Sequence, residues 1–426
     1  MTDMKTRRPR FVAYAIAIIV AITAMPWGEA QARGGQARGY FAPKAKAGNR
    51  GLHHFRLRRN SAAIDQGSNG VKMIITDKKG RVIVDTKIGN KLGAGIGQDK
   101  LLPRANQKRA KLAAKEFASL LKKYKVKAND VRFIATAAVR NAKGTPKPKS
   151  KKITGKSLIK RLRNILGTKS NRMRILSGAK EAELGFRGAL IAWSPNRLRR
   201  VVGRSVDRIM VIDTGGGSHQ VSVGNHERIE ALGSSQQGSH FVNSAIFAGP
   251  DGALPETLNA DELARADQKL ALRVRQLPKN VQTNTPLDRQ VLGGSTPVLT
   301  GGLAKFVRLY FGTDRVTRGD IKRMRSALAE KNRDERPRYI AEVIAQNISR
   351  APEHPHRLKL SKKQLEVQAE ARGVAVKSGK KSYRGTNLVA KATLLLRVLE
   401  LAGISRDAQS VLISASDSRH QLLLAD

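Results

Sequence analysis

The chain contains 426 residues, with 81 Lys and Arg against 33 Asp and Glu, which gives a formal net charge of +48 at pH 7. It contains no cysteine, which excludes a disulfide scaffold, a thiol nucleophile and any cysteine-based zinc or iron–sulfur site. Hydrophobic residues make up 40% of the chain, enough for folded cores, and the length corresponds to domains of about 100–200 residues each, two or three in number. Such a charge predicts an anionic partner, although a uniformly basic proteome would produce it as well.

Residues 1–32 have the order of an export signal. Basic residues precede a charge-free apolar stretch at 11–27. Small residues then occupy positions −3 and −1 relative to a predicted cleavage site after Ala32. This order predicts a periplasmic or extracellular protein. The alternative is a membrane anchor formed by 11–27, which is at the short end of the roughly 17–25 residues that a span needs. Residues 33–57 are rich in Gly, Arg and Lys, and we interpret them as a flexible basic linker.

The predicted fold begins with a strand that ends at Asp65, and a second strand is predicted at 71–76, with a third after it at 81–84. The turn between the first two strands contains Gly67, Ser68 and Asn69. Glycine admits positive φ and lets a ligand approach the backbone, so that successive N–H groups can form an anion-binding concavity. A carboxylate at the end of the preceding strand can hold a hydrated divalent cation.

The same unit occurs a second time. A strand predicted at 209–212 ends at Asp213, and a returning strand is predicted at 220–223. The turn between them contains Gly215, Gly216, Gly217 and Ser218. One copy alone would favour a plain glycine hairpin, whereas two copies with Asp at the same offset favour a pair of phosphate loops that hold a phosphate chain between them. The repeat predicts homologous domains at 58–200 and 201–426, with the last helix able to pack back on the first domain.

Five further short segments complete the pattern: Leu-Gly-Ala-Gly-Ile at 92–96, Ala-Thr-Ala-Ala-Val-Arg-Asn-Ala at 135–142, Ser-Gly-Ala-Lys-Glu-Ala at 177–182, Thr-Gly-Gly at 300–302 and Ser-Asp-Ser-Arg at 416–419. Together with the two loops, their order and spacing resemble the exopolyphosphatase / guanosine pentaphosphate phosphohydrolase (Ppx/GppA) family of the actin-like ATPase superfamily. The resemblance implies an α/β fold of two actin-like (RNase H-like) domains, each with a mixed sheet flanked by helices, and an active site in the interdomain cleft.

The resemblance also implies roles for single residues. Glu181 matches the catalytic carboxylate that activates the attacking water, on a helix for which Ser177 is the expected N-cap. Arg140 matches a phosphate-binding arginine, which we expect at the end of a strand at 133–135, and a guanidinium suits phosphoryl oxygens. From the residues alone, Glu181 is equally a favourable acidic residue near a helix N-terminus. Arg140 could be one more surface arginine.

The resemblance places Asp65 and Asp213 around a divalent cation, expected to be Mg²⁺. The chain departs from the family at Gln220, where the family has a glutamate that contributes to the metal or water site. Glutamine keeps the shape and a carbonyl oxygen but loses the charge, which weakens a Mg²⁺ site because Mg²⁺ favours carboxylates. The departure puts turnover, rather than binding, in question.

Residues 142–174 contain twelve Lys and Arg and no acidic residue, and they lie in sequence between Arg140 and Glu181. We expect this tract to bind polyphosphate with a strong salt dependence, as for nucleic acids. Aromatic residues are almost absent from it, which argues against base stacking and hence against a specific nucleic-acid partner. The alternative is an ordinary solvated basic face. Residues 351–384 are rich in Pro, His and Lys and contain no motif that we can interpret.

These observations predict an exported exopolyphosphatase that releases terminal orthophosphate from polyphosphate by metal-assisted attack of water. Gln220 motivates one alternative, a catalytically impaired homologue that binds polyanions. A second alternative is a hydrolase of nucleotide polyphosphates of the guanosine pentaphosphate type. Export disfavours this function because stringent-response nucleotides are cytosolic. If residues 11–27 instead anchor the protein facing the cytoplasm, that objection no longer applies. The oligomeric state stays open, with a homodimer among the alternatives.

Overall fold

The computed structural model describes residues 59–414 except 148–149, 250, 282, 286, 333–334 and 350–383, and beyond them residues 419, 421 and 423. The predicted export signal, its alternative as an anchor and the linker at 33–57 therefore lie outside the described residues, as does nearly all of 351–384. Among the helices that are described, none is both long and apolar enough to cross a membrane.

The first sheet has the strand order β3-β2-β1-β4-β5. Its strands are β1 (Ser61–Gln66), β2 (Gly70–Thr76), β3 (Val82–Gly89), β4 (Val131–Ala135) and β5 (Met173–Ile175). The first three strands pair antiparallel, whereas β4 and β5 continue the sheet parallel to β1. Strand β3 is longer than the predicted 81–84, because it lies at the edge of the sheet and tolerates polar residues after Val84 that a buried strand would not.

The second sheet repeats this order as β8-β7-β6-β9-β11 and adds β10 at its far edge. Its strands are β6 (Ile209–Thr214), β7 (His219–Gly224), β8 (Ile229–Ser235), β9 (Thr296–Thr300), β10 (Arg315–Thr317) and β11 (Ser410–Ile413). Strands β6, β7 and β8 again form an antiparallel meander, and β9 again runs parallel to the first of them. The predicted internal repeat, with one mixed sheet in each half, is confirmed.

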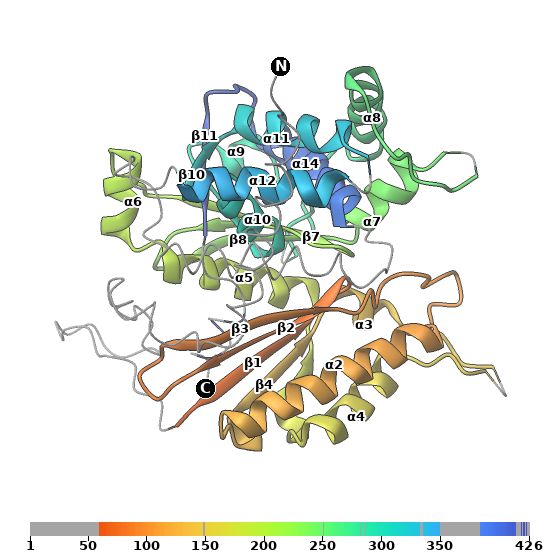
Figure 1. The fold of residues 1–426 in the computed structure, drawn as a ribbon. Coiled ribbons are helices and arrows are strands. Elements are labelled where there is room, and N and C mark those ends of the chain that lie inside the picture. The colour runs from red at the N-terminus through yellow and green to blue at the C-terminus, as the bar shows by residue number, and fades with distance from the viewer. Residues whose placement is uncertain are drawn as a thin grey trace, which may run out of the picture.

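Helices flank both sheets (Figure 1). They are α2 (Arg104–Lys123), α3 (Ala137–Asn141), α4 (Gly155–Leu166), α5 (Gly178–Ala192), α6 (Pro195–Val202), α7 (Ser239–Val242), α8 (Ala260–Arg273), α9 (Arg289–Leu292), α10 (Gly301–Phe311), α11 (Arg318–Glu330), α12 (Glu335–Ser349) and α14 (Arg384–Leu401), with the short turns η1 (Ala128–Asp130), η2 (Ser170–Arg172) and η3 (Asn243–Phe247).

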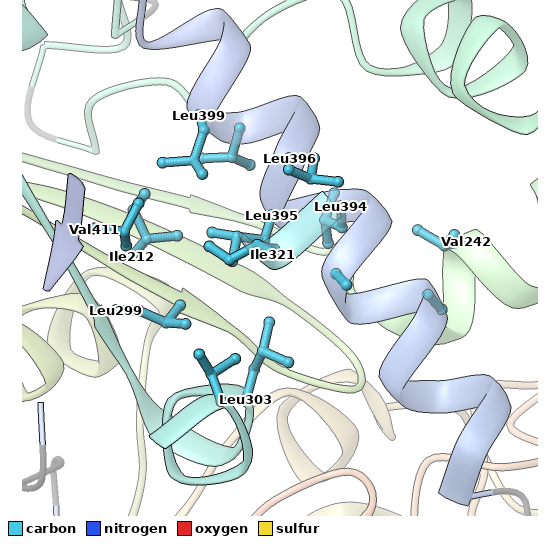
Figure 2. Packing of buried hydrophobic residues seen from close by; sticks show 14 of the residues in the cluster. Ile212, Val242, Leu299, Leu303, Ile321, Leu394, Leu395, Leu396, Leu399 and Val411 are labelled. Atoms are coloured by element: carbon cyan, nitrogen blue, oxygen red, sulfur yellow. The ribbon is translucent and has the colours of Figure 1, made fainter. Parts of the chain in front are cut away.

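Strand β6 shows how the second sheet is buried on both faces. Met210 and Ile212 point into a core shared with α10, α11 and α14, where Figure 2 shows Ile212 beside Leu299 and Leu395. Ile209 and Val211 point the opposite way, into a core shared with α5 and α6. Burying one such side chain contributes about 1.5–3 kcal/mol, so a strand that is apolar on both faces is expected here.

The first sheet is covered differently on its two faces. Helices α2 and α4 pack on one face. On the other, Ala63 and Ile74 contact Leu423, and Ile134 contacts Leu184 of α5. Because α5 and α6 pack mainly on the second sheet, lobe I denotes residues 59–177 and lobe II denotes residues 178–414. The domain bounds inferred from the sequence stay a prediction.

Candidate active site

In each sheet one tight glycine turn follows the first strand. In lobe I the N–H of Gly67 donates to the carbonyl oxygen of Gly70 at 3.0 Å, and in lobe II the N–H of Gly215 donates to that of Ser218 at 2.9 Å. The turns are equivalent in position, because β1 and β6 are the equivalent strands of the two sheets. They are the two loops that the sequence predicts.

The two turns are in direct contact across the lobes. A Cβ atom on Gly216 would lie 2.4 Å from Nδ2 of Asn69, and one on Gly217 would lie 2.5 Å from Oγ of Ser68. Any side chain at these two positions would therefore displace the side chain of Asn69 or Ser68 from the contact. The absence of side chains at Gly216 and Gly217 lets the two turns pack against each other, and it also leaves their backbone accessible to a ligand.

Backbone donors remain in both turns. The N–H groups of Ser68, Asn69, Gly216 and Gly217 donate to no acceptor among the described residues. Successive N–H groups of this kind form an anion-binding concavity. An anion that uses all four would lie beside the contact between the turns or would separate them.

A third segment, which carries His240, completes this contact. The N–H of His240 donates to the carbonyl oxygen of Gly216 at 2.9 Å, and its ring nitrogen Nε2 hydrogen-bonds to Oδ1 of Asn69. Burial, together with the charge of Lys391, lowers the pKa of His240 to about 4. The ring is therefore neutral at pH 7 and ties the turn of lobe I to the start of α7 in lobe II.

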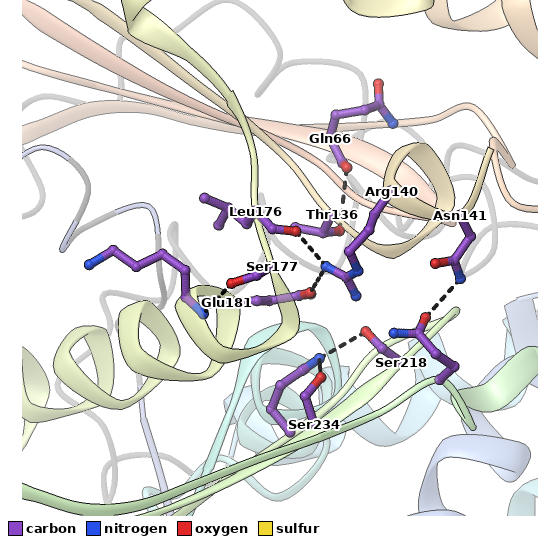
Figure 3. Close-up of polar contacts among 12 residues, drawn as sticks. Gln66, Thr136, Arg140, Asn141, Leu176, Ser177, Glu181, Ser218 and Ser234 are labelled. Atoms are coloured by element: carbon purple, nitrogen blue, oxygen red, sulfur yellow. Dashed lines mark hydrogen bonds and ion pairs between the residues drawn. The ribbon is translucent and has the colours of Figure 1, made fainter. Parts of the chain in front are cut away.

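Arg140 lies on the short helix α3. The sequence analysis places it at the end of a strand at 133–135, and that prediction is wrong. Strand β4 ends at Ala135, and the chain enters α3 directly afterwards. The Nη1 atom of Arg140 donates to the carbonyl oxygen of Leu176 at 2.8 Å and to Oε2 of Glu181 at 3.0 Å (Figure 3). Its Nη2 atom is buried and has no partner among the described residues. A buried donor without a partner is costly and points to a ligand oxygen at this position.

Glu181 lies in the first turn of α5, where Ser177 caps the helix as predicted by accepting a hydrogen bond from the N–H of Lys180. Its side chain keeps 17% of its surface exposed. Burial raises the pKa of Glu181 to about 7, the paired Arg140 opposes this, and the carboxylates of Asp65 and Asp213 add to the rise. Near neutral pH the group can therefore both hold and accept a proton.

Glu183, on the same helix, has a different environment. It forms ion pairs with Lys180 at 2.8 Å and with Arg187 at 3.1 Å. Partial burial raises the pKa of Glu183, but the hydrogen bonds and charges of its two partners outweigh burial and hold the pKa below its usual value. Glu183 is thus a carboxylate of the helix surface that is ionised at neutral pH.

Asp65 and Asp213 lie one residue before the ends of the first strands of the two sheets, and both act electrostatically on Glu181. The Oδ2 atom of Asp65 lies 3.6 Å from Nζ of Lys72, while its Oδ1 atom is buried without a partner among the described residues. The carboxylate of Asp213 lies so close above Gly301 that a Cβ atom there would be 2.4 Å from Oδ1.

These two carboxylates fit a Mg²⁺ ion that is shared with a substrate. Among the described residues, no group of three or more His, Asp or Glu side chains could hold a metal by itself. Mg²⁺ is commonly bound by one or two carboxylates, several waters and substrate phosphates, and the unpartnered Oδ1 atom of Asp65 suits that arrangement.

Gln220 is buried, and its side-chain nitrogen is already engaged. Nε2 donates to Oγ of Ser218 at 2.9 Å and to Oγ of Ser234 at 3.4 Å. The amide thereby ties the second turn to β8, which a carboxylate without a proton could not do in the same way. Only the amide oxygen is left for a cation or a water.

The sequence motifs include one further residue of this arrangement without giving it a role, and they miss another. Gly301 belongs to the Thr-Gly-Gly motif at 300–302, and its φ of +77° and its closeness to Asp213 explain why glycine occupies the position. His240 carries no sequence signal, because its contacts are made only when the lobes meet. The closing motif at 416–419 is described only at Arg419, whose Nη1 atom pairs with Asp85 of β3 at 2.7 Å.

The sequence profile of the Ppx/GppA phosphatase family matches residues 73–343 of the chain. The chain is 27% identical over 223 residues to Exopolyphosphatase 2 of Mycobacterium tuberculosis, a match that covers 50% of this chain and 62% of that protein. It is 24% identical over 195 residues to a bifunctional 3-dehydroquinate synthase/phosphatase of Fusobacterium nucleatum, covering 44% of this chain and 26% of that protein. The matches thus span less than two thirds of these relatives.

Solved structures agree with the topology. The crystal structure of the Aquifex aeolicus member of the Ppx/GppA family superposes with a TM-score of 0.54 at 16% identity, covering 86% of this chain and 96% of that one. The crystal structure of an exopolyphosphatase from Cytophaga hutchinsonii superposes with a TM-score of 0.56 at 19% identity, covering 86% and 97%. With the repeated strand order, these matches confirm the predicted actin-like fold.

Replacing Gly301 by alanine tests the packing under Asp213. The new Cβ atom would be held at a left-handed φ and would clash with the carboxylate, so Gly301→Ala is expected to lower the free energy of unfolding by about 1–3 kcal/mol. Gly302→Ala is the matched control, because its Cβ atom would lie 3.4 Å from the flexible end of Lys391 and alanine favours a helix. Urea unfolding measures both, and equal effects would contradict this account.

The raised pKa of Glu181 predicts a pH-dependent cost of folding. The unfolded carboxyl ionises near its ordinary value of 4.5, whereas the folded one holds its proton to about 7, so stability falls as the pH rises between these values. Relative to Glu181→Gln, the wild type should lose about 3 kcal/mol across this range and no more above it. Urea unfolding of both proteins in EDTA from pH 4 to pH 8 measures the difference, which a normal carboxyl would keep constant.

Proposed function

Because this chain belongs to the Ppx/GppA phosphatase family, we propose that it is an exopolyphosphatase that releases orthophosphate from the end of inorganic polyphosphate. One observation carries the proposal: a buried carboxyl with a pKa near 7 is paired with an arginine whose second nitrogen has no partner, on α5 and α3 beside the two glycine turns. The names of the M. tuberculosis relative and of the C. hutchinsonii structure support polyphosphate as the substrate class.

Each group has a defined task in this reaction. Ionised Glu181 accepts a proton from a water molecule as the water oxygen attacks the terminal phosphorus. The new P–O bond forms while the bond from phosphorus to the bridging oxygen breaks, and the electron pair leaves with the shortened chain. Nη2 of Arg140 donates to a non-bridging oxygen of the transferred group, and the N–H groups of the two turns donate to others.

A divalent cation, proposed to be Mg²⁺, would be held by Asp65 and Asp213 together with phosphate oxygens. When bound, it would neutralise charge on the phosphate oxygens and polarise the reacting group. The excess of carboxylates around Glu181 supports this part of the proposal, because an anionic substrate would otherwise meet like charge. Export, suggested by residues 1–32 alone, stays part of the proposal and is tested by sequencing the N-terminus of the protein recovered from the host.

Gln220 supports a second candidate, a homologue that binds polyphosphate without hydrolysing it. Its amide nitrogen is committed to Ser218 and Ser234, and the position lacks the charge that a Mg²⁺ site favours. Binding would then rest on the turns, Arg140 and the surrounding basic surface, none of which needs a carboxylate at position 220. Direct measurement of phosphate release in Mg²⁺ separates the two candidates.

Removing the base should stop the reaction and leave binding intact. Glu181→Gln keeps the shape and a hydrogen-bond acceptor for Arg140 but cannot take a proton at neutral pH, so orthophosphate release from long polyphosphate should fall at least about 100-fold. The dissociation constant for polyphosphate should change by less than about threefold, because the substitution removes no cation.

Glu183→Gln is the control for this experiment, since it removes the same charge from the same helix outside the proposed site. It should release phosphate at nearly the wild-type rate. Unchanged release by the Glu181 variant, or equal loss in both variants, would show that Glu181 is not the base.

Restoring the carboxylate tests the role of position 220. Gln220→Glu should lower the Mg²⁺ concentration needed for half-maximal phosphate release several-fold, because it adds a charged oxygen beside the second turn. A wild type that is inactive at every Mg²⁺ concentration and a Gln220→Glu variant that is active would establish the second candidate instead. Titration of orthophosphate release with Mg²⁺ measures both outcomes.

A further inference from the structure

Lobe I carries a basic groove of about 640 Å³ that includes none of the residues of the candidate active site. It lies along α2 and the first part of the acid-free tract, on the helical face of the first sheet, which Figure 1 shows at the bottom of the molecule. The groove is lined by Arg104, Gln107, Lys108, Lys111, Leu112, Lys115, Ser150, Lys151, Ile153 and Arg161.

The cations of the groove are aligned and unneutralised. Four of them recur along α2 every three or four residues, which places them on one face of the helix over a length of about 16 Å. Two more come from the opposite wall, Lys151 and Arg161. Within the described part of the chain none of the six forms an ion pair with a carboxylate, although Lys152, next to the groove, does so with Asp99.

The two walls are held together by a buried glutamine. Gln107 is 4% exposed, and its Nε2 atom donates to the carbonyl oxygens of Leu102 at 3.0 Å and of Lys151 at 2.8 Å. Beside it, Leu102 and Ile153 pair as an antiparallel bridge. The acid-free tract is therefore fixed against α2 at this point, so that its cations face those of the helix across a defined groove.

We propose that this groove is a second binding site for inorganic polyphosphate, which holds a distal stretch of a long chain while one end is in the active site. The identity of the ligand rests on the proposed function. A row of cations without carboxylate partners suits a linear polyanion, because every unit of such a chain carries charge and the cations need not distinguish one unit from the next. Nucleic acid is disfavoured because no aromatic side chain lines the groove, and single-strand binders stack bases on aromatic rings.

Two triple variants with equal loss of charge test the site. The groove variant is Lys108→Gln, Lys111→Gln and Lys115→Gln, which keeps residues that favour a helix. The control is Lys122→Gln, Lys123→Gln and Lys127→Gln, which removes the same charge from exposed positions of the same lobe outside the groove. Circular dichroism and thermal unfolding confirm that both variants are folded.

Binding is measured on the full chain in EDTA, so that nothing is hydrolysed, with long-chain inorganic polyphosphate, tripolyphosphate and a single-stranded oligothymidylate as probes. For long polyphosphate the groove variant should bind at least about tenfold more weakly than the control, and its plot of log affinity against log salt should be shallower by about two. The difference between the variants should be much smaller for tripolyphosphate, which is too short to reach both sites.

Equal weakening of both variants would overturn the proposal, because the charge would then act diffusely. Selective loss of oligothymidylate binding, with polyphosphate binding retained, would overturn it in favour of a nucleic-acid site. Phosphate release by the wild type is measured separately. If the wild type releases orthophosphate but the groove variant shows no selective loss of polyphosphate affinity, only the groove proposal is refuted. If the groove variant does lose affinity selectively but the wild type releases no orthophosphate, only the proposed hydrolysis is refuted.

Discussion

The arrangement of the molecule depends on the contact of the two turns, in which side chains of the first turn meet glycines of the second. Asn69 lies against Gly216, and Ser68 lies against Gly217, so closely that a Cβ atom on either glycine would force the neighbouring side chain to move. Because each turn continues the first strand of its sheet, this contact brings the ends of β1 and β6 to the same place. Asp65 of lobe I thereby joins Asp213 of lobe II in raising the pKa of Glu181, which Asp65 could not do if the lobes were apart.

The contact also concentrates acidic charge in a strongly basic chain. Three carboxylates share this region with Arg140, which pairs with only one of them, while the net charge of the whole chain is +48. The interior of the site therefore attracts a cation, whereas the surface attracts an anion and steers it over a longer range. A divalent cation would complement the acidic interior of the site, and a phosphate chain would complement the basic surface. The two ligands together would match both charge distributions, whereas either alone would match only one.

Local features of the sequence were sufficient to predict much of this site. Strands, glycine turns and the cap at Ser177 depend on neighbouring residues, so both loops and the start of α5 were predicted where they occur. The helix that carries Arg140 was not predicted, because a buried strand and a five-residue helix at 137–141 leave little periodicity to separate them. His240 could not be found at all, since its partner Asn69 lies 171 residues away in sequence.

The acid-free tract was noticed in the sequence, but its place was not predictable, because the groove depends on a bridge between Leu102 and Ile153 and on the bonds of Gln107. The resulting division of charge has a mechanical consequence. Cations that are free of carboxylates hold a polyanion through contacts that salt can replace one at a time, so the chain can slide along them. In the proposed reaction a terminal phosphate needs fixed geometry instead, and Arg140 has this because Leu176 and Glu181 orient it. Separating the two tasks lets the end of a chain be positioned rigidly while its length stays mobile.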